Sequence, residues 1–342
     1  MVKICVIPGD GVGKEVIPAA VEVLGNLGLG LEFVEAAAGF ECFQRSGDAI
    51  PEKTLAEIES CGVALFGATS SPTTGAVTGY RSPILAMRKA FNLYANLRPV
   101  QSLPGPFSRP NIDLLVVREN TEGLYAGRER REGETAIAER VITVRGSERI
   151  ARVAFENAHK RRSQIPKSQN PKIPIVTIVH KANVLKITDG LFREECLRVA
   201  AEFPEVEVKE MLVDAMAMRL VRDPENFDVI VTTNLFGDIL SDEASALIGG
   251  LGVAPSANVG ERVAVFEPVH GSAPDIAGQG IANPIGAILS AAMLLDHIGE
   301  GAAARRVREA VNATLAAGVW PRDLGGGAGT HGVTGAVVQN LV

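Results

Sequence analysis

The chain has few aromatic residues and few cysteines for its length. Aromatic side chains make up 5% of its 342 residues, and only one is tryptophan. The four cysteines, Cys5, Cys42, Cys61 and Cys196, are scattered and form no C-x-x-C pair. This distribution speaks against a disulfide framework and is typical of buried thiols in a reducing compartment.

Long hydrophobic runs and an excess of positive charge are also missing. The longest mostly apolar run, Ile285–Leu295, is too short to cross a bilayer, and no basic segment precedes an apolar stretch at the start. The 34 Lys and Arg against 40 Asp and Glu give a net charge of −6, which argues against a nucleic-acid platform. We therefore expect a cytoplasmic protein that binds neither membranes nor nucleic acid.

Glycine and apolar residues are abundant. The chain has 36 glycines, 46% hydrophobic residues and 22% charged residues, a composition that excludes wholesale disorder. Many glycines with few aromatics indicate tight turns and small-residue packing, as in an α/β enzyme. At roughly 150 residues per domain, the length predicts two domains.

Apolar runs alternate with helical patterns along the chain. Val2–Ile7 predicts a buried strand, followed by a glycine turn and an amphipathic helix over Glu15–Leu24. The same alternation continues with Leu31–Val34, Pro51–Ser60 and Val63–Phe66, and further strands are predicted at Ile112–Val117, Ile173–Val179, Val206–Leu212, Val229–Val231 and Val263–Phe266. Proline-rich connections are predicted at Gln101–Asn111 and His159–Pro174. This order favours a largely parallel sheet covered on both faces.

A Rossmann fingerprint is suggested by Gly9-x-Gly11-x-Gly13 after the first strand, with Glu35 near the place of a ribose-binding acid. Lys14 occupies the position where the third glycine of G-x-G-x-x-G is required. We therefore favour a glycine turn that joins strand to helix, with any dinucleotide held elsewhere.

Paired acids follow the predicted strand Val229–Val231. Asp238 and Asp242 are four residues apart, which on a helix places both carboxylates on one face. Like charges at this spacing repel unless a cation lies between them, and oxygen ligands suit Mg²⁺ or Mn²⁺. A third acid, Asp214, ends another apolar stretch. The alternative is that these acids are simply solvated.

Basic residues and a tyrosine complement these acids. Arg88, Arg98 and Arg118 can each bind a carboxylate in a bidentate fashion, and together with a metal they would hold a di- or tricarboxylate. Lys181 follows a predicted strand, where a lysine near a metal can act as a base, and Tyr125 could return a proton. Surface ion pairs and structural roles remain the alternatives for each.

A glycine-containing cluster runs from Glu267 to Gly278 and is followed by Asn283-Pro284. Its small residues expose backbone N–H groups and allow a phosphate-bearing ligand to approach closely. Asp275 could accept hydrogen bonds from a ribose diol and repel a 2′-phosphate. The cluster therefore indicates a loop that binds a phosphate-bearing ligand with an unphosphorylated ribose.

These motifs resemble the metal-dependent β-decarboxylating 2-hydroxyacid dehydrogenases, a family that includes isocitrate, 3-isopropylmalate and homoisocitrate dehydrogenases. The resemblance runs from Ile7-Pro8-Gly9-Asp10-Gly11 to the C-terminal region and is most specific in Asn234–Asp242 and Glu267–Pro284. It implies two α/β domains around a parallel or mixed sheet that is not a Rossmann fold. Residues 1–98 and 254–342 would form a large domain with the NAD loop, and 99–253 a small domain with the metal acids and a dimer interface.

The resemblance also implies roles for individual residues. Arg88, Arg98 and Arg118 would hold the malate-like part of the substrate, and Asp214, Asp238 and Asp242 the metal, with one acid from the neighbouring subunit of a homodimer or dimer of dimers. Lys181, also from the neighbour, would be the base, and Tyr125 the acid. The implied NAD contacts are Thr69, Ser70, Ser71, Asn183, Gly271, Ser272, Ala273, Pro274, Asp275 and Asn283, of which Ser71 and Asn183 would also contact substrate.

Finer features favour homoisocitrate as the substrate. Asn120 follows Arg118-Glu119, as in tricarboxylate enzymes, and the stretch Ser71–Ile84 resembles fungal homoisocitrate dehydrogenases. Ile84 stands where isocitrate enzymes typically carry asparagine, so the longer acid would reach towards Ser71, Ser82 or Arg81. The implied reaction gives 2-oxoadipate and CO₂ for lysine biosynthesis. The alternatives are NAD-dependent isocitrate dehydrogenase, then 3-isopropylmalate dehydrogenase, and a silent regulatory subunit, which would be expected to lack some of these residues.

Overall fold

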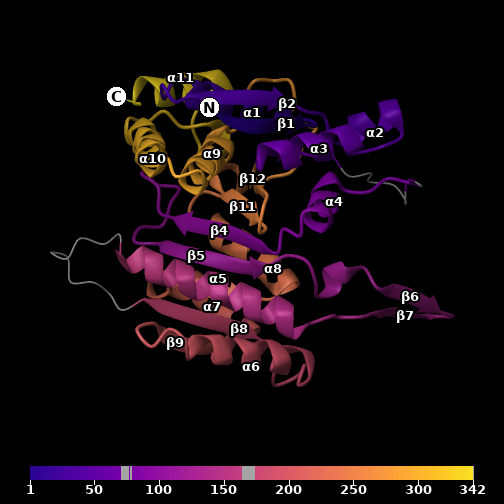
Figure 1. Ribbon diagram of the computed structural model, residues 1–342. Helices are drawn as coiled ribbons and strands as arrows, with labels where there is room; N and C mark the ends of the chain where they lie inside the picture. The colour runs from indigo at the N-terminus through magenta and orange to yellow at the C-terminus, as the bar shows by residue number, and fades with distance from the viewer. Residues whose placement is uncertain (71–76, 78, 164–173, 342) are drawn as a thin grey trace. The chain divides into compact units, whose positions relative to one another are not determined.

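The computed structural model describes residues 1–70, 77, 79–163 and 174–341 (Figure 1). The chain divides into two compact units. Unit 1 consists of Met1–Leu93, Ser102–Pro110 and Ser245–Val342, and unit 2 of Tyr94–Gln101 and Asn111–Ala244. Residues 102–110 and 245–253, predicted to belong to the small domain, cluster with unit 1, and residues 94–98, predicted to belong to the large domain, cluster with unit 2.

The described residues of unit 1 form five strands in the order β2-β1-β3-β12-β11. They are β1 (Val2–Gly9), β2 (Leu31–Glu35), β3 (Val63–Ala68), β11 (Pro255–Val259) and β12 (Ala264–Pro268). Neighbours are parallel except β11 and β12, which form an antiparallel pair. All six residues of β3 are buried, because helices cover the sheet and a central strand of parallel neighbours has no solvent-facing side.

Seven α-helices and two 3₁₀ turns flank these strands in the described part of unit 1. They are α1 (Gly13–Gly25), α2 (Phe40–Ser46), α3 (Glu52–Cys61), α4 (Pro83–Ala90), α9 (Ile285–His297), α10 (Gly301–Ala316), α11 (Thr330–Gln339) and the 3₁₀ turns η3 (Leu251–Val253) and η4 (Arg322–Leu324), the last two being single turns. Helix α9 is apolar almost all round, since it packs on β11 and β12 on one side and on α1 and α10 on the other.

The glycine turn after β1 is an element of this fold. Gly11 has φ +55°, and a Cβ there would lie 2.0 Å from the carbonyl oxygen of Ser272. That oxygen accepts a hydrogen bond from the N–H of Val12 at 2.9 Å. Glycine is required because the turn packs directly against the backbone of the Ser272 loop.

In the described part of unit 2, one set of five paired strands has the order β4-β5-β10-β8-β9. They are β4 (Ala95–Gln101), β5 (Asp113–Glu119), β8 (Ile175–His180), β9 (Glu207–Leu212) and β10 (Val229–Thr232), and a separate antiparallel pair is formed by β6 (Glu129–Glu132) and β7 (Thr135–Ala138). Only β4 runs antiparallel to its neighbour in the five-stranded set. The carboxyl ends of β5, β8, β9 and β10 consequently share one edge of this sheet.

The helices of unit 2 include α5 (Val144–Ser163), α6 (Thr188–Ala200), α7 (Val213–Arg222) and α8 (Asn234–Ala246), with single turns η1 (Leu124–Ala126) and η2 (Pro224–Asn226). Helices α5 and α6 pack side by side, and α5 also packs on β5 and β10 (Figure 1). Helix α8 begins two residues after β10 ends, so its first turns lie at the carboxyl edge of the sheet.

The predicted mixed α/β architecture is confirmed, and the predicted strands and helices were found within a few residues of their expected bounds. Three kinds of strand were missed. Strand β4 contains Pro99 and Arg98, β11 begins at Pro255, and β6 and β7 are almost wholly exposed, so none shows a buried apolar run. The middle of the predicted connection His159–Pro174 lies outside the described residues, as does Ser71. No described helix combines the length and hydropathy needed to span a bilayer.

Candidate active site

Arg118 is a deeply buried cation of unit 2. It stands near the end of β5, and its neighbour in β10 is Thr232, just before α8. Its side chain is 1% exposed, and Nη1 donates to the Asp238 carboxylate. Nε and Nη2 both donate to Oδ1 of Asn234, at 3.1 and 2.8 Å. A Cβ on Gly237 would lie 2.6 Å from Cγ of Arg118, so α8 needs glycine there to let the arginine pass.

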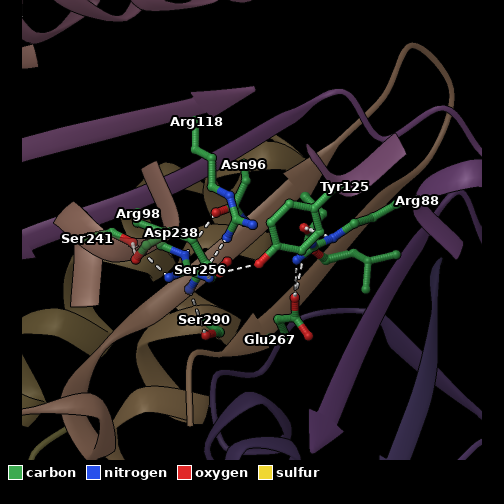
Figure 2. A network of polar contacts seen from close by, with 12 residues as sticks. Arg88, Asn96, Arg98, Arg118, Tyr125, Asp238, Ser241, Ser256, Glu267 and Ser290 are labelled. Atoms are coloured by element: carbon green, nitrogen blue, oxygen red, sulfur yellow. Dashed lines mark hydrogen bonds and ion pairs between the residues drawn. The ribbon is translucent and has the colours of Figure 1, made fainter. Parts of the chain in front are cut away.

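Arg98 on β4 completes the cluster from the other side of β5. Nη1 donates to Ser241 Oγ at 2.7 Å and to Asp242 Oδ1 at 2.8 Å, and Nη2 lies 3.4 Å from Asp238 Oδ1. Nε donates to Asn96 Oδ1 at 2.9 Å. Figure 2 shows Arg98 and Arg118 converging on Asp238. The predicted i, i+4 acids therefore do share a face of α8, and two arginines neutralise them.

Tyr125 joins the same group through its hydroxyl, which donates to Asp238 Oδ2. Its ring lies under the guanidinium of Arg118, whose Cζ is 5.1 Å from the ring centroid. Burial, with the hydrogen bond to Asp238 and the charge of that carboxylate, raises the pKa of Tyr125 above its usual value. The phenol therefore holds its proton, as a proton donor must.

Lys181 and Asp214 form a second cluster in unit 2. Lys181 follows β8 and Asp214 follows β9, and because these strands are parallel neighbours the two residues meet at the carboxyl edge, where Nζ is ion-paired with Oδ1. This hydrogen bond lowers the pKa of the Asp214 carboxyl. Asp214 does not join Asp238 and Asp242, and the described residues contain no group of three side chains suited to a metal. The predicted three-acid set thus requires an acid from a second subunit, and it stays a prediction.

Arg88 of unit 1 is hydrogen-bonded to Asn258 and lies near Glu267, two residues of the same unit. It lies in the last turn of α4, 8% exposed, and Nε donates to Asn258 Oδ1 at 3.2 Å. Its Nη2 is 3.7 Å from Glu267 Oε1 (Figure 2). The same Oε1 accepts a hydrogen bond from Asn258 Nδ2 at 2.7 Å. A buried arginine fixed at its base in this way keeps a defined direction.

A cavity of about 400 Å³ opens in unit 1 beside the Gly271 loop. Its wall includes His270, Gly271, Ala273, Asn283 and Asp323. Asn283 Nδ2 donates to Asp323 Oδ2 at 3.0 Å, and Asn283 Oδ1 accepts from the N–H of Ile285. A Cβ on Gly252 would lie 2.2 Å from Asp323 Oδ2 and fill part of this space.

His270 supplies an unsatisfied polar atom in this wall. Nδ1 contacts the carbonyl oxygen of Gly271 at 3.0 Å, which assigns the proton to Nδ1 and leaves Nε2 as an acceptor. That Nε2 is buried and has no hydrogen-bond partner among the described residues. Burial lowers the pKa of His270, so the ring is neutral near pH 7. A buried acceptor of this kind suits the amino group of a bound base.

Ser70 and Ser272 link the cavity loop to the first strands of unit 1. Their hydroxyls are 2.9 Å apart, and the N–H of Ser70 donates to the buried Asp10 carboxylate at 2.9 Å. Ala273 has φ +36°, a left-handed conformation uncommon outside glycine. Thr69 precedes Ser70 directly, and Pro274 and Asp275 follow Ala273 on the exposed side of the loop. Asn183 is exposed on the turn after Lys181.

Several residues of these clusters were not predicted as site residues. Asn234 and Ser241 lie inside the motif that contains the two acids, where their spacing from Asp238 was the available signal. His270 likewise stands at the start of the predicted cofactor loop. Asn258 and Asp323 carry no sequence signal, because each is defined by a partner far away in the chain. Asn96 is only two residues from its partner Arg98, but the strand β4 that carries both was not predicted.

Comparison with known proteins identifies the family. A model of isocitrate/isopropylmalate dehydrogenases matches residues 3–340. The chain belongs to this family. It is 55% identical over 339 residues to an isocitrate/homoisocitrate dehydrogenase of Thermus thermophilus, with 99% of this chain and 98% of that protein covered. It is 52% identical over 352 residues to a homoisocitrate dehydrogenase of Methanocaldococcus jannaschii, covering 100% and 98%.

Solved structures agree with this assignment. Isocitrate dehydrogenase from Methylococcus capsulatus matches with a TM-score of 0.92 at 43% identity, covering 100% of this chain and 99% of that one. Among the sequence relatives, a 3-isopropylmalate dehydrogenase of Methanothermobacter thermautotrophicus is 49% identical over 340 residues, covering 99% of this chain and 98% of that protein. The protein is therefore a β-decarboxylating dehydrogenase acting on a small molecule. Enzymes of this family generally use NAD(P) and a divalent metal.

Both groups suit the residues present. Asp238 and Asp242 offer carboxylate oxygens with side chains 31% and 48% exposed, so positions remain open for Mg²⁺ or Mn²⁺ and for further oxygen ligands. The cavity of unit 1 offers a free acceptor on His270, small residues along one wall and an exposed acid at Asp275. These features suit the adenosine part of a dinucleotide.

Proposed function

We propose that the protein catalyses the NAD-dependent oxidative decarboxylation of homoisocitrate to 2-oxoadipate and CO₂. Support comes from one observation above all: Arg98, Arg118, Tyr125 and the two acids of α8 form a single hydrogen-bonded network at the carboxyl edge of the unit 2 strands. Two fixed guanidiniums bind carboxylates and two acids bind a divalent cation, the combination that a hydroxy tricarboxylate requires.

The proposed active unit is a homodimer, or a dimer of dimers, whose sites are shared. Within one chain Lys181 pairs with Asp214 and not with the Asp238 network. In a shared site, Lys181 and Asp214 of one subunit would complete the network of the other. This arrangement would bring a base, a third metal acid and the clamp arginines to one substrate.

The roles of the side chains follow from their chemistry. Arg118 and Arg98 orient the substrate carboxylates by bidentate hydrogen bonds, while Asn234 and Asn96 keep the guanidinium planes fixed. Lys181 Nζ takes the proton of the substrate hydroxyl as hydride leaves, and Tyr125 Oη returns a proton to the carbon that has lost CO₂. Bound Mg²⁺ or Mn²⁺ supplies Lewis acidity, and bound NAD accepts the hydride.

We further propose that Thr69, Ser70, Ser71, Asn183, the Gly271–Asp275 loop and Asn283 bind NAD. Asp275 favours NAD over NADP because a 2′-phosphate beside this exposed carboxylate would meet a like charge. Arg88 binds the remaining substrate carboxylate from unit 1, and Ser71 contacts the substrate as well.

Isocitrate is the second candidate substrate, because a relative at 55% identity is named an isocitrate/homoisocitrate dehydrogenase. Rates with homoisocitrate, isocitrate and 3-isopropylmalate, each with NAD and with NADP, test the proposal. We expect the highest kcat/KM with homoisocitrate and NAD, then isocitrate, then isopropylmalate. A higher kcat/KM with isopropylmalate, or equal values with NADP and NAD, would contradict it. A silent regulatory subunit finds no support, since the arginines, Lys181 and the acids are all present.

A further inference from the structure

A carboxylate with no exposed surface supports the turn that carries Lys181. Asp189 lies in the first turn of α6 and is 0% exposed. Its Oδ2 accepts the backbone N–H of Lys181 at 2.6 Å. The carbonyl oxygen of Lys181 in turn accepts the N–H groups of Val184 and Leu185, at 3.0 and 2.8 Å. The Lys181 peptide is therefore held on both sides, and Asp189 holds the N–H side.

Arg140 is the counter-ion that makes this buried carboxylate tolerable. Its Nη2 is 2.6 Å from Asp189 Oδ1, and its side chain is only 12% exposed. A buried acid without a cation would be strongly destabilised, and a buried pair is costly to break from either side. Arg140 follows β7 and lies far from Asp189 in the chain, so local structure alone does not require this contact.

Arg140 also contacts the turn that begins α8. The same Nη2 donates to Thr233 Oγ1 at 2.8 Å, and the guanidinium lies over the ring of Phe236, with Cζ 4.5 Å from the centroid. Between Thr233 and Phe236 stands Asn234, which holds the guanidinium of Arg118. One arginine thus ties the β8–α6 turn, with Lys181, to the β10–α8 turn, with the arginine clamp.

We propose that Asp189 and Arg140 are positioning residues for catalysis: their buried ion pair fixes the Lys181 backbone in register with the turn that orients Arg118. The role rests on the proposed function, in which Lys181 is the base. A lysine side chain is long and flexible, so the reach of Nζ depends on a fixed backbone. In a shared-site dimer, the pair would set how each subunit presents its lysine to the partner.

Kinetics and hydrogen exchange on the full-length protein test this role. In Asp189→Asn the amide still accepts the Lys181 N–H but cannot neutralise Arg140, and in Arg140→Met the carboxylate loses its cation. Since misplacement of a catalytic group by about 1 Å can cost 10²-fold, we expect kcat to fall by roughly 10- to 100-fold in each variant. KM for substrate and for NAD should change by less than about threefold, because neither Asp189 nor Arg140 is among the proposed substrate or NAD contacts.

Exchange of the Lys181 amide separates positioning from general destabilisation. We expect that amide to exchange at least about tenfold faster in both variants, with the β1 amides unchanged. Arg193→Met is the matched control: Arg193 lies on the same helix and is ion-paired with Glu210, but its side chain is 44% exposed. It should alter neither kcat nor Lys181 exchange. Uniformly faster exchange, or an equal kcat loss in Arg193→Met, would overturn the proposal.

The double variant Arg140→Met/Asp189→Asn keeps the test informative if a single variant folds poorly. Removing both charges should recover thermal stability relative to Arg140→Met, because no unpaired buried charge remains. It should not recover kcat, since the tie between the turns is still absent. Recovery of both would overturn the proposal. Measuring Lys181→Met alongside separates the failure of the proposed function from the failure of this inference. An active Lys181→Met enzyme would refute the proposed role of Lys181 as the base. Exchange of the Lys181 amide would still report on the positioning role of the ion pair.

Discussion

The Asp238 network of unit 2 and the His270 cavity of unit 1 are built from different kinds of residues and suit different kinds of ligand. The network consists of charged side chains that face one another, with Arg118 and Arg98 between the acids of α8. The cavity is lined mainly by glycines, apolar side chains and one neutral ring, with Arg322 and Asp323 as its charged residues. The Asp323 carboxylate accepts a hydrogen bond from the amide of Asn283. A charged substrate and metal need the first, and a large, mostly neutral nucleoside needs the second.

This difference predicts that the two regions fail in different ways. Changes in the network should lower kcat, because charges there act on the reacting atoms. Changes in the cavity should raise KM for NAD and leave kcat at saturating NAD nearly intact, because shape there governs binding. The five changes below run from the largest expected effect to the smallest.

Lys181→Met should give the largest loss. The uncharged side chain has a similar length but cannot take a proton, so kcat should fall by about 10²- to 10⁴-fold, the usual contribution of general base catalysis. Steady-state kinetics with saturating metal, substrate and NAD measures it. Mixing Lys181→Met with Arg118→Ala subunits should restore activity at one site of each hybrid dimer. No recovery after verified subunit exchange would count against shared sites.

Gly237→Ala should damage the network by crowding alone. The added Cβ would meet Cγ of Arg118 at 2.6 Å, and overpacking of this kind typically costs about 1–3 kcal/mol. We expect kcat/KM to fall by roughly 10- to 100-fold as the guanidinium shifts. Gly335→Ala on α11 is the control, since a Cβ there meets nothing within 4 Å. If both variants keep wild-type kinetics, Arg118 has more freedom than its contacts indicate.

The charged residues of the network could be predicted from the sequence more readily than the residues that hold them in place. Asp238 and Asp242 are four residues apart, and that spacing alone placed them on one face of α8. Asn258 could not be found in this way, because its contact with Arg88 depends on strand order. Asn96 is two residues from its partner Arg98, but both lie on a strand that was not predicted. This strand, β4, was missed because Pro99 and Arg98 break its apolar pattern, and only pairing with β5 makes it a strand.

Ile84→Asn should change substrate preference by about tenfold, within the range that one small group in a pocket can supply. The amide offers a hydrogen bond to a carboxylate held close in, so the ratio of kcat/KM should move from homoisocitrate towards isocitrate. Ile84 also packs against the unit 1 core, so Ile84→Leu controls for lost packing. An unchanged ratio in Ile84→Asn would refute this account of specificity and leave the family assignment intact.

Gly252→Ala is the cavity counterpart of Gly237→Ala. Its Cβ would lie 2.2 Å from Asp323 Oδ2 and 3.0 Å from Asn283 Nδ2, and would displace this pair into the space proposed for NAD. We expect KM for NAD to rise by roughly fivefold while kcat changes less than twofold, as for loss of uniform binding. Fluorescence titration with NADH gives the affinity directly. A fall in kcat with an unchanged KM for NAD would contradict the expectation that the cavity governs binding and the network governs kcat.

The smallest effect should come from His270 and pH. Burial lowers the pKa of His270 in the folded protein below its usual value near 6.5, so the unfolded chain binds a proton more readily. The neutral ring contributes stability that is fully present above about pH 6.5 and is lost as the pH falls from there towards the folded pKa. One such group changes the unfolding free energy by at most about 1.4 kcal/mol per pH unit. Urea unfolding of His270→Gln should therefore show a shallower loss of stability between pH 6.5 and 5. If His270→Gln leaves the pH dependence of the unfolding free energy unchanged, the His270 ring is already solvated in the folded protein. The cavity would then lack the desolvated acceptor that distinguishes it from the charged network.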